Sequence, residues 1–169
     1  MPLRNTAAFE NLVRAYSADL YRFIYWLSRD RCVAEDVVQE TFAKVWKAWH
    51  QLRDETAVKA WLFKIARNEY MRTFQRKRIV ADVDIEDVDI RIDHNIADEL
   101  GMRQAVAALP ESYREPLLLQ VLGGLSCSEI AASLAISEGA VMTRLTRARQ
   151  TLRKLWEPES AGGKLYELS

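Results

Sequence analysis

The sequence predicts an all-α protein made of two small helical domains joined by an acidic flexible linker. Apolar residues recur at helical spacing over most of the 169 residues, and residues 5–78 contain neither glycine nor proline. Charge is arranged in blocks, with two basic segments on either side of an acidic one. We therefore divide the chain into a first domain, a linker, a second domain and a loose tail, at residues 5–78, 79–98, 99–156 and 157–169.

The overall composition is that of a folded protein without obvious targeting signals. Hydrophobic residues make up 49% and charged residues 28%, and 24 basic residues balance 24 acidic ones. No apolar run approaches the roughly 20 residues that span a bilayer, and the start MPLRNTAAFE lacks the apolar core of a signal peptide. The expected location is the cytoplasm. The two cysteines and two histidines show no ligand spacing, so neither a metal site nor a cofactor is expected.

An amphipathic helix is expected in the middle of the first domain. Its apolar residues alternate in spacing between four and three: Val38, Phe42, Val45, Trp49 and Leu52. Glu35 and Asp36 lie in its first turn, where negative charge suits the helix dipole. The opposite face carries Asp36, Glu40, Ala43 and Lys47. This face is expected to be solvated or to meet a partner.

A second helix is expected from about Val58 to Arg78, after a short polar connection over residues 50–56. Residues 59–78 hold seven basic side chains and one acid, Glu69. Trp61, Phe63, Tyr70 and Phe74 are interleaved with these bases. Rings that stack on unpaired bases and cations that follow phosphates suit single-stranded DNA. A plain reading is equally open, in which the rings are core and the bases are solvated.

The linker, residues 79–98, contains seven acids and one base. Its alternation of apolar and acidic residues is typical of a strand. A single strand has no partner in an otherwise helical chain, so we favour an extended, solvated linker. The alternative is that it adds to the surface of a partner.

The second domain predicts a helix-turn-helix. One helix ends near Pro110 and another covers about residues 112–122, before Gly123 and Gly124. Ser126 and Glu129 form a capping box for a short helix, and a tight turn over residues 135–137 follows. Ser137 then caps a longer helix that buries Val141, Leu145, Ala148, Leu152 and Leu155.

The exposed stripe of that last helix is predicted to carry DNA-binding residues. It contains Arg144, Arg147, Thr151 and Lys154, and residues 137–156 hold five bases against one acid, Glu138. Arg144 and Arg147 are one turn apart, and arginine reads guanine in the major groove. Thr143, Thr146 and Ser137 can bond phosphates or bases. The alternative reading of such a stripe is solvated surface.

Catalytic constellations are not recognisable in the sequence. There is no GxSxG and no phosphate-binding glycine loop. Glu35, Asp36 and Glu40 cluster, but they lie on a helix face predicted to be solvated. We expect a binding protein, without catalytic residues and without a small-molecule substrate.

Four motifs, in order, resemble the extracytoplasmic-function (group four) sigma factors of the sigma-70 family. They cover roughly residues 8–156, and their order and spacing are more specific than any one of them. The motifs are AEDVVQETF at 34–42 with Val45-Trp46, WLFKIARN at 61–68, LPESYRE at 109–115, and GLSCSEIA at 124–131 followed by ISEGAV at 136–141 and Arg147-Ala-Arg149.

The resemblance implies a factor that gives bacterial RNA polymerase core its promoter specificity, melts promoter DNA and starts transcription of a stress- or signal-responsive regulon. It implies polymerase binding by Asp36, Gln39 and Glu40. It implies contacts to the minus-ten element by Leu52, Arg53, Asp54, Arg67, Asn68, Lys77 and Arg78. It implies reading of the minus-thirty-five element by Ser137, Glu138, Thr143, Arg144, Arg147 and Thr151. A membrane-anchored anti-sigma factor that holds the protein inactive, at the inner membrane, is also implied.

This chain departs from the family at three positions and leaves two other functions open. Arg72 stands where an Asp is frequent, and Ala140 and Thr143 stand where Thr and Ser are frequent, which leaves the promoter sequence open. One alternative is a plain helix-turn-helix regulator whose first domain dimerises or senses a signal. The other is a sigma mimic that titrates an anti-sigma factor without touching DNA, although Arg144 and Arg147 argue against it.

Overall fold

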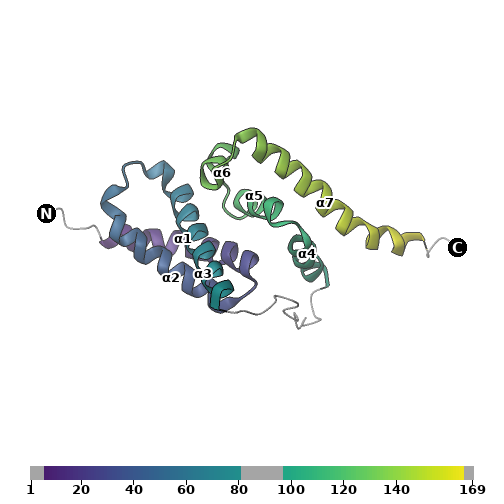
Figure 1. Cartoon of the computed structure of the whole chain (residues 1–169), viewed down its shortest axis with the longest axis horizontal. Coiled ribbons are helices and arrows are strands. Elements are labelled where there is room, and N and C mark those ends of the chain that lie inside the picture. The colour runs from purple at the N-terminus through teal and green to yellow at the C-terminus, as the bar shows by residue number, and fades with distance from the viewer. Residues whose placement is uncertain (1–5, 81–96, 166–169) are drawn as a thin grey trace.

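The computed structural model describes residues 6–80 and 97–165, and side chains over 6–76, apart from residue 55, and 101–155. Within these ranges every regular element is helical, which confirms the all-α prediction (Figure 1). The α-helices are α1 Thr6–Ser28, α2 Arg31–Ala48, α3 Val58–Val80, α4 Ala97–Ala108, α5 Glu111–Val121, α6 Cys127–Leu134 and α7 Glu138–Leu165. The acidic linker predicted for 79–98 lies almost entirely outside the described residues.

The first unit consists of α1, α2 and α3, which pack against one another. Helix α2 begins one turn earlier than its acidic residues suggest. The Asp30 carboxylate is the N-cap and accepts from the backbone N–H groups of Cys32, at 2.8 Å, and Val33, at 3.2 Å. Two short 3₁₀ turns, Trp49–Gln51 and Glu55–Ala57, form the predicted connection to α3.

The second unit, α4 to α7, contains the predicted helix-turn-helix. Ser126 accepts from the N–H of Glu129, and the Glu129 carboxylate accepts from the N–H of Ser126, so the capping box is confirmed. Ala135 ends α6 in the left-handed conformation, with φ 54°. The Ser137 hydroxyl accepts from the N–H of Ala140 at 3.1 Å, which confirms its capping role for α7.

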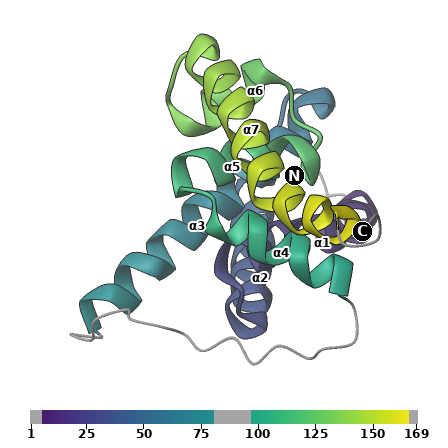
Figure 2. The ribbon, with the colours of Figure 1, turned by 90° about the vertical axis from the view of Figure 1, so that its right-hand side faces the viewer.

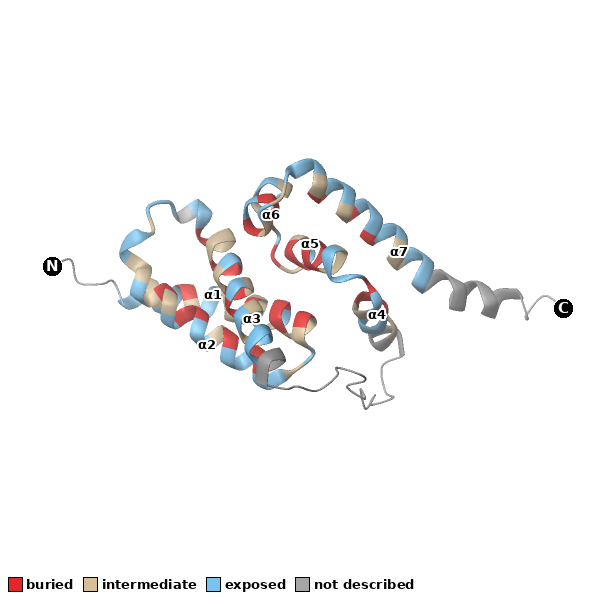
Figure 3. Cartoon of the chain, viewed as in Figure 1, coloured by how far each residue is buried: buried red, intermediate tan, exposed pale blue. Residues whose placement is uncertain are grey.

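The two units are packed on one another through α1 and α3. Helix α1 contacts α4 and α5, while α3 contacts α6, and the buried apolar residues of both units form one continuous cluster. Figure 3 shows the buried faces of α3 and α5 turned inward. The Arg103 guanidinium of α4 lies 5.8 Å and 5.9 Å from the ring centroids of Tyr25 and Trp26 in α1. The described structure is therefore closed.

Helix α7 is longer than the sequence predicts. We expect a loose tail from residue 157, but the helical backbone continues to Leu165 and projects away from the rest of the molecule (Figure 1). In Figure 2 this end of α7 points towards the viewer. Extending a helix that has already formed needs no new nucleus, so weak helix formers can still be included. Over the described residues, no helix is both long and apolar enough to cross a membrane.

Candidate nucleic-acid interface

The core-facing residues of α7 determine which of its side chains point outward. Val141, Leu145 and Ala148 are 0%, 2% and 0% exposed and hold one side of the helix against α5 and α6. At about 100° per residue, the opposite side is centred on Thr143 and Gln150. The outward face of α7 is therefore rotated relative to the predicted stripe.

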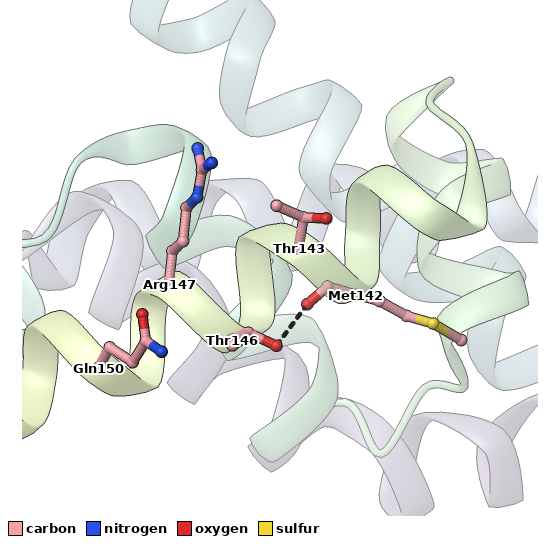
Figure 4. Close-up of a pocket in the computed structure, with 5 residues that line it drawn as sticks. All are labelled: Met142, Thr143, Thr146, Arg147 and Gln150. Atoms are coloured by element: carbon pink, nitrogen blue, oxygen red, sulfur yellow. Dashed lines mark hydrogen bonds between the residues drawn. The ribbon is translucent and has the colours of Figure 1, made fainter.

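Five residues of this outward face line a shallow hollow (Figure 4). They are Met142, Thr143, Thr146, Arg147 and Gln150. Arg144 and Thr151, which belong to the predicted stripe, are only half-exposed and do not line this hollow. The prediction followed basic residue type, whereas the angle is set by the apolar residues of the buried side. We name these five residues the α7 outward face.

Sequence reasoning left Met142 and Gln150 out of the candidate site. Their signal was available, because each is four residues from Thr146 and therefore only about 40° from it around the helix axis. Arg147 is exposed on the same face, while Ser137 and Glu138 are exposed at the N-terminus of the helix. Thr143 and Thr146 donate their hydroxyl hydrogens to the carbonyls of Gly139 and Met142, at 3.0 Å and 2.9 Å. Each hydroxyl oxygen retains acceptor capacity.

Helix α7 is anchored to α5 beside this face. The Arg149 guanidinium donates to the side-chain oxygen of Gln120 in α5. Arg149 therefore has an intramolecular partner, in contrast to Arg147, for which no such bond is found among the described residues. This hydrogen bond holds α7 against α5 in addition to the packing of its apolar side.

The aromatic residues of α3 separate into core and surface. Phe63 is 0% exposed and the Tyr70 ring is buried, with its hydroxyl donating to the carbonyl of Leu27 at 3.3 Å. Burial raises the pKa of Tyr70, with Glu111 adding to the effect. Trp61 is half-buried, and Phe74 is 37% exposed, with its ring 6.2 Å from that of Tyr70. Of the four rings expected to stack on bases, Phe74 is therefore the most accessible, and only in part.

The connection between α2 and α3 presents the other predicted minus-ten residues. Arg53 and Asp54 are exposed and Leu52 is half-buried. The Asp54 carboxylate accepts from the N–H of Thr56 at 2.9 Å and from its hydroxyl at 2.6 Å. Both hydrogen bonds lower the pKa of Asp54, and the bond from the Thr56 hydroxyl has the larger effect. The loop is therefore shaped locally around a charged carboxylate.

Arg67 has a partner that the sequence did not suggest. Its Nε and Nη2 donate to the two carboxylate oxygens of Glu115 in α5, each at 3.2 Å. The two side chains are 21% and 8% exposed, so this bidentate pair is largely shielded from solvent. Burial raises the pKa of Glu115 above its ordinary value, and Arg67 opposes that rise. In the closed structure Arg67 is bound across the interface between the units.

The remaining polar residues of α3 include both exposed side chains and a buried acid with basic partners. Asn68 and Lys64 are exposed, while the side chains of Lys77 and Arg78 lie outside those described. Glu69 is 6% exposed and pairs with the Lys44 ammonium of α2 and, at 3.7 Å, with Arg72. The acid that interrupts the basic segment thus ties α3 to α2.

The predicted polymerase-binding residues lie together on α2. Asp36, Gln39 and Glu40 are all exposed, one to four residues apart on the face turned away from the core. The buried side of the same helix contains Val37, Phe42 and Val45. Among the described residues, no group of three or more His, Cys, Asp or Glu could hold a metal ion.

A capped helix-turn-helix with an exposed N-terminal face on its second helix defines this chain as a helix-turn-helix protein. The Sigma-70 region 2 family matches residues 12–79, and the Sigma-70 region 4 family matches residues 96–152. The chain therefore belongs to the sigma-70 family of transcription initiation factors, in its extracytoplasmic-function group.

Individual relatives agree over nearly the whole length. The ECF RNA polymerase sigma factor SigX of Bacillus subtilis is 31% identical over 88% of this chain and 84% of that protein. The sigma factor RpoE of Bartonella quintana, solved in complex with the anti-sigma factor NepR, superposes with a TM-score of 0.75 at 32% identity, over 89% of this chain and 97% of the other. CnrH, solved with the cytosolic domain of CnrY, gives 0.69 at 27% identity over 91% and 90%.

Proposed function

We propose that this sigma factor binds RNA polymerase core through Asp36, Gln39 and Glu40 of α2. The observation that carries the proposal is that this exposed acidic face and the α7 outward face lie on different units of a two-part chain. One face is available for a protein and the other for duplex DNA. A plain helix-turn-helix regulator needs no second exposed acidic face of this kind.

The α7 outward face would read the minus-thirty-five element as duplex DNA. Arg147 is suited to guanine, and Thr143 and Thr146 retain acceptor oxygens for base edges or bridging water. Ser137 and Glu138 lie at the positive N-terminal end of α7, and a phosphate can approach the exposed N–H groups beside them. Arg144 and Thr151, at the edge of the face, would contact the backbone.

Helix α3 and the connection before it would hold the minus-ten element as single strand. Asn68, Arg53 and Asp54 are exposed there, and Phe74 offers one ring for stacking. Melting would be non-enzymatic, because bases captured outside the helix compensate for lost stacking, about 1.4 kcal/mol per step. Arg67 would join this surface after leaving Glu115, and Lys77 and Arg78 would extend it.

An anti-sigma factor would keep the protein inactive. RpoE was solved with the anti-sigma factor NepR and CnrH with the cytosolic domain of CnrY, and the matches cover 89% and 91% of this chain. The closed packing described here is therefore similar to a partner-bound arrangement. We further propose a cytoplasmic location, membrane anchoring of the anti-sigma factor, and no catalytic activity of the chain itself.

The test is in vitro transcription with purified core polymerase on genomic fragments, with start sites sequenced. We expect initiation at a shared two-part motif only when the protein is added. Tight core binding without initiation would indicate a sigma mimic. Binding to DNA without any core binding would leave the plain regulator.

Charge reversal then tests the polymerase surface. Glu40→Lys with Asp36→Lys should abolish co-elution with core polymerase, because both carboxylates lie on the proposed contact face. Glu10→Lys is the matched control, since Glu10 is an exposed helical glutamate on α1. Normal co-elution of the α2 variant would refute the assignment.

A second pair of variants tests the DNA surface. Arg147→Ala should weaken holoenzyme binding to promoter DNA by about five-fold or more, with core binding unchanged, since a bidentate base contact is worth about 1–3 kcal/mol. Arg14→Ala, an exposed arginine on α1, should have no such effect. Equal promoter affinity for both variants would refute the assignment of the α7 outward face to the DNA interface.

A further inference from the structure

Met142 is a large apolar side chain that the fold does not use. It is 55% exposed, although its neighbour Val141 is 0% exposed and fills the core beneath α7. Single exposed apolar residues are common on protein surfaces, so exposure alone indicates nothing. The position of Met142 is what distinguishes it.

Met142 lies within the α7 outward face, in the second turn of the helix. It lines the same shallow hollow as Thr143, Thr146 and Arg147, and Figure 4 shows its side chain extended away from the helix. The other large exposed apolar residues of the described chain, Val121, Leu155 and Phe74, do not line this hollow. Helix-turn-helix proteins present the N-terminal residues of the second helix to base edges.

The chemistry of the major groove restricts what an apolar side chain can recognise there. Its base edges offer hydrogen-bond donors and acceptors, together with one apolar group, the 5-methyl group of thymine. Methionine is unbranched and polarisable, so it adapts to such a small target. Of the five residues that line the hollow, Met142 is the one whose side chain has neither a strong hydrogen-bond donor nor a strong acceptor.

We propose that Met142 is a specificity-determining residue that contacts the 5-methyl group of one thymine in the minus-thirty-five element. This inference rests on the proposed reading of that element by α7. Met142 and Arg147 are separated by about 7.5 Å of helix rise, so the thymine lies within about three base pairs of the guanine read by Arg147.

The experiment replaces each thymine of the minus-thirty-five element, one at a time, by deoxyuridine, which removes only the methyl group. The probe is a promoter on which the holoenzyme initiates, and the measurement is holoenzyme affinity. We expect the wild type to lose affinity about four-fold at one thymine, which corresponds to the burial of one methyl-sized group. Met142→Ala should lose a similar factor on the unmodified promoter and be insensitive to deoxyuridine at that position.

Two further variants separate recognition from structure. Met142→Leu should retain sensitivity to the methyl group, because it remains apolar and of similar size. Val121→Ala, which removes an exposed apolar side chain of α5, should respond as the wild type does. Met142 is exposed on a helix, so its replacement by alanine should leave the circular dichroism spectrum unchanged.

Three results would overturn the inference. They are a wild type that is insensitive to every single replacement, a Met142→Ala variant with the sensitivity of the wild type, and a loss of core binding in that variant. In each case initiation by the wild-type holoenzyme still supports the proposed function. Failure of the wild type to initiate at all refutes the proposed function, and the role of Met142 falls with it.

Discussion

The ion pair between Arg67 and Glu115 predicts an asymmetric response to its two single substitutions. Glu115 is 8% exposed and Arg67 is 21% exposed, so the carboxylate is the more deeply buried partner. Arg67→Ala leaves a buried carboxylate without its cation. Glu115→Ala leaves an arginine whose long side chain can carry its charge towards water. Removal of Arg67 should therefore destabilise the protein more than removal of Glu115.

The magnitudes follow from the burial of each group. Removing one partner of a buried pair costs about 3–5 kcal/mol, and partial exposure of Arg67 places Arg67→Ala near 3 kcal/mol, at the low end of that range. Glu115→Ala should cost about 1.5 kcal/mol, which is the lower value for hydrogen bonds to charged groups. The double variant should lose less than the sum of the two single losses, because the second substitution removes the group left unpaired.

The assay is urea unfolding at pH 7, followed by far-ultraviolet circular dichroism. The apolar cluster is continuous through both units, so their helices should unfold together and report this interface. Arg72→Ala is the control, because Arg72 is 55% exposed and lies 3.7 Å from Glu69, which also has Lys44 as a partner. Its cost should stay within about 0.5 kcal/mol. Equal stabilities of Arg67→Ala and Arg72→Ala would refute the reasoning.

The pH dependence of the same carboxyl has a defined sign. Burial raises the pKa of Glu115 in the folded state, so the folded protein holds this proton more tightly than the unfolded chain does. The contribution of Glu115 to stability is then complete below its unfolded pKa and is lost as pH rises through the raised folded pKa. Glu115→Gln should remove that loss, and its stability relative to the wild type should improve from pH 4 to pH 7. A constant difference would contradict the assigned burial.

Three further predictions concern the helix-turn-helix and its core. Ser126→Ala should cost about 1 kcal/mol in thermal unfolding through loss of the capping box, whereas Ser128→Ala, exposed and outside the box, should be nearly neutral. Ala135→Gly should stabilise by about 0.5 kcal/mol, because relief of left-handed strain exceeds the added flexibility of the unfolded chain; destabilisation would contradict it. Leu119→Ala, at 0% exposure, should cost about 2–5 kcal/mol in urea unfolding, against less than about 0.5 kcal/mol for Val121→Ala, at 67%.

Features decided by neighbouring residues could be predicted from the sequence. The capping box of Ser126 and Glu129, the Ser137 cap and the exposed acidic face of α2 each depend on residues within one or two turns. The Asp30 cap was equally local, and it was missed because acidic residues further along were taken as the first turn. Local signals thus predicted the starts of α6 and α7 but not the start of α2.

Features decided by packing between distant segments could not be predicted in this way. Arg67 and Glu115 are 48 residues apart, and no spacing rule relates them. Phe63 and Phe74 both lie among the bases of α3, yet only the packing of the units makes one core and the other surface. The α7 outward face could have been predicted from the sequence, but it was predicted only in part. Its angle follows from Val141, Leu145 and Ala148, but basic residue type drew the prediction towards Arg144.

The Arg67 guanidinium binds the Glu115 carboxylate at 3.2 Å in the closed structure. In the proposed function it would instead contact the phosphate backbone of the melted strand, and it cannot bind both anions at once. The two equilibria are then linked, and the coupling free energy is the same in both directions. Binding of DNA by Arg67 would weaken the contact between α3 and α5 by the same free energy by which this contact weakens DNA binding. A substitution chosen only to strengthen the closed packing would therefore reduce promoter affinity. Separation of α3 from α5 and capture of the melted strand would be coupled steps.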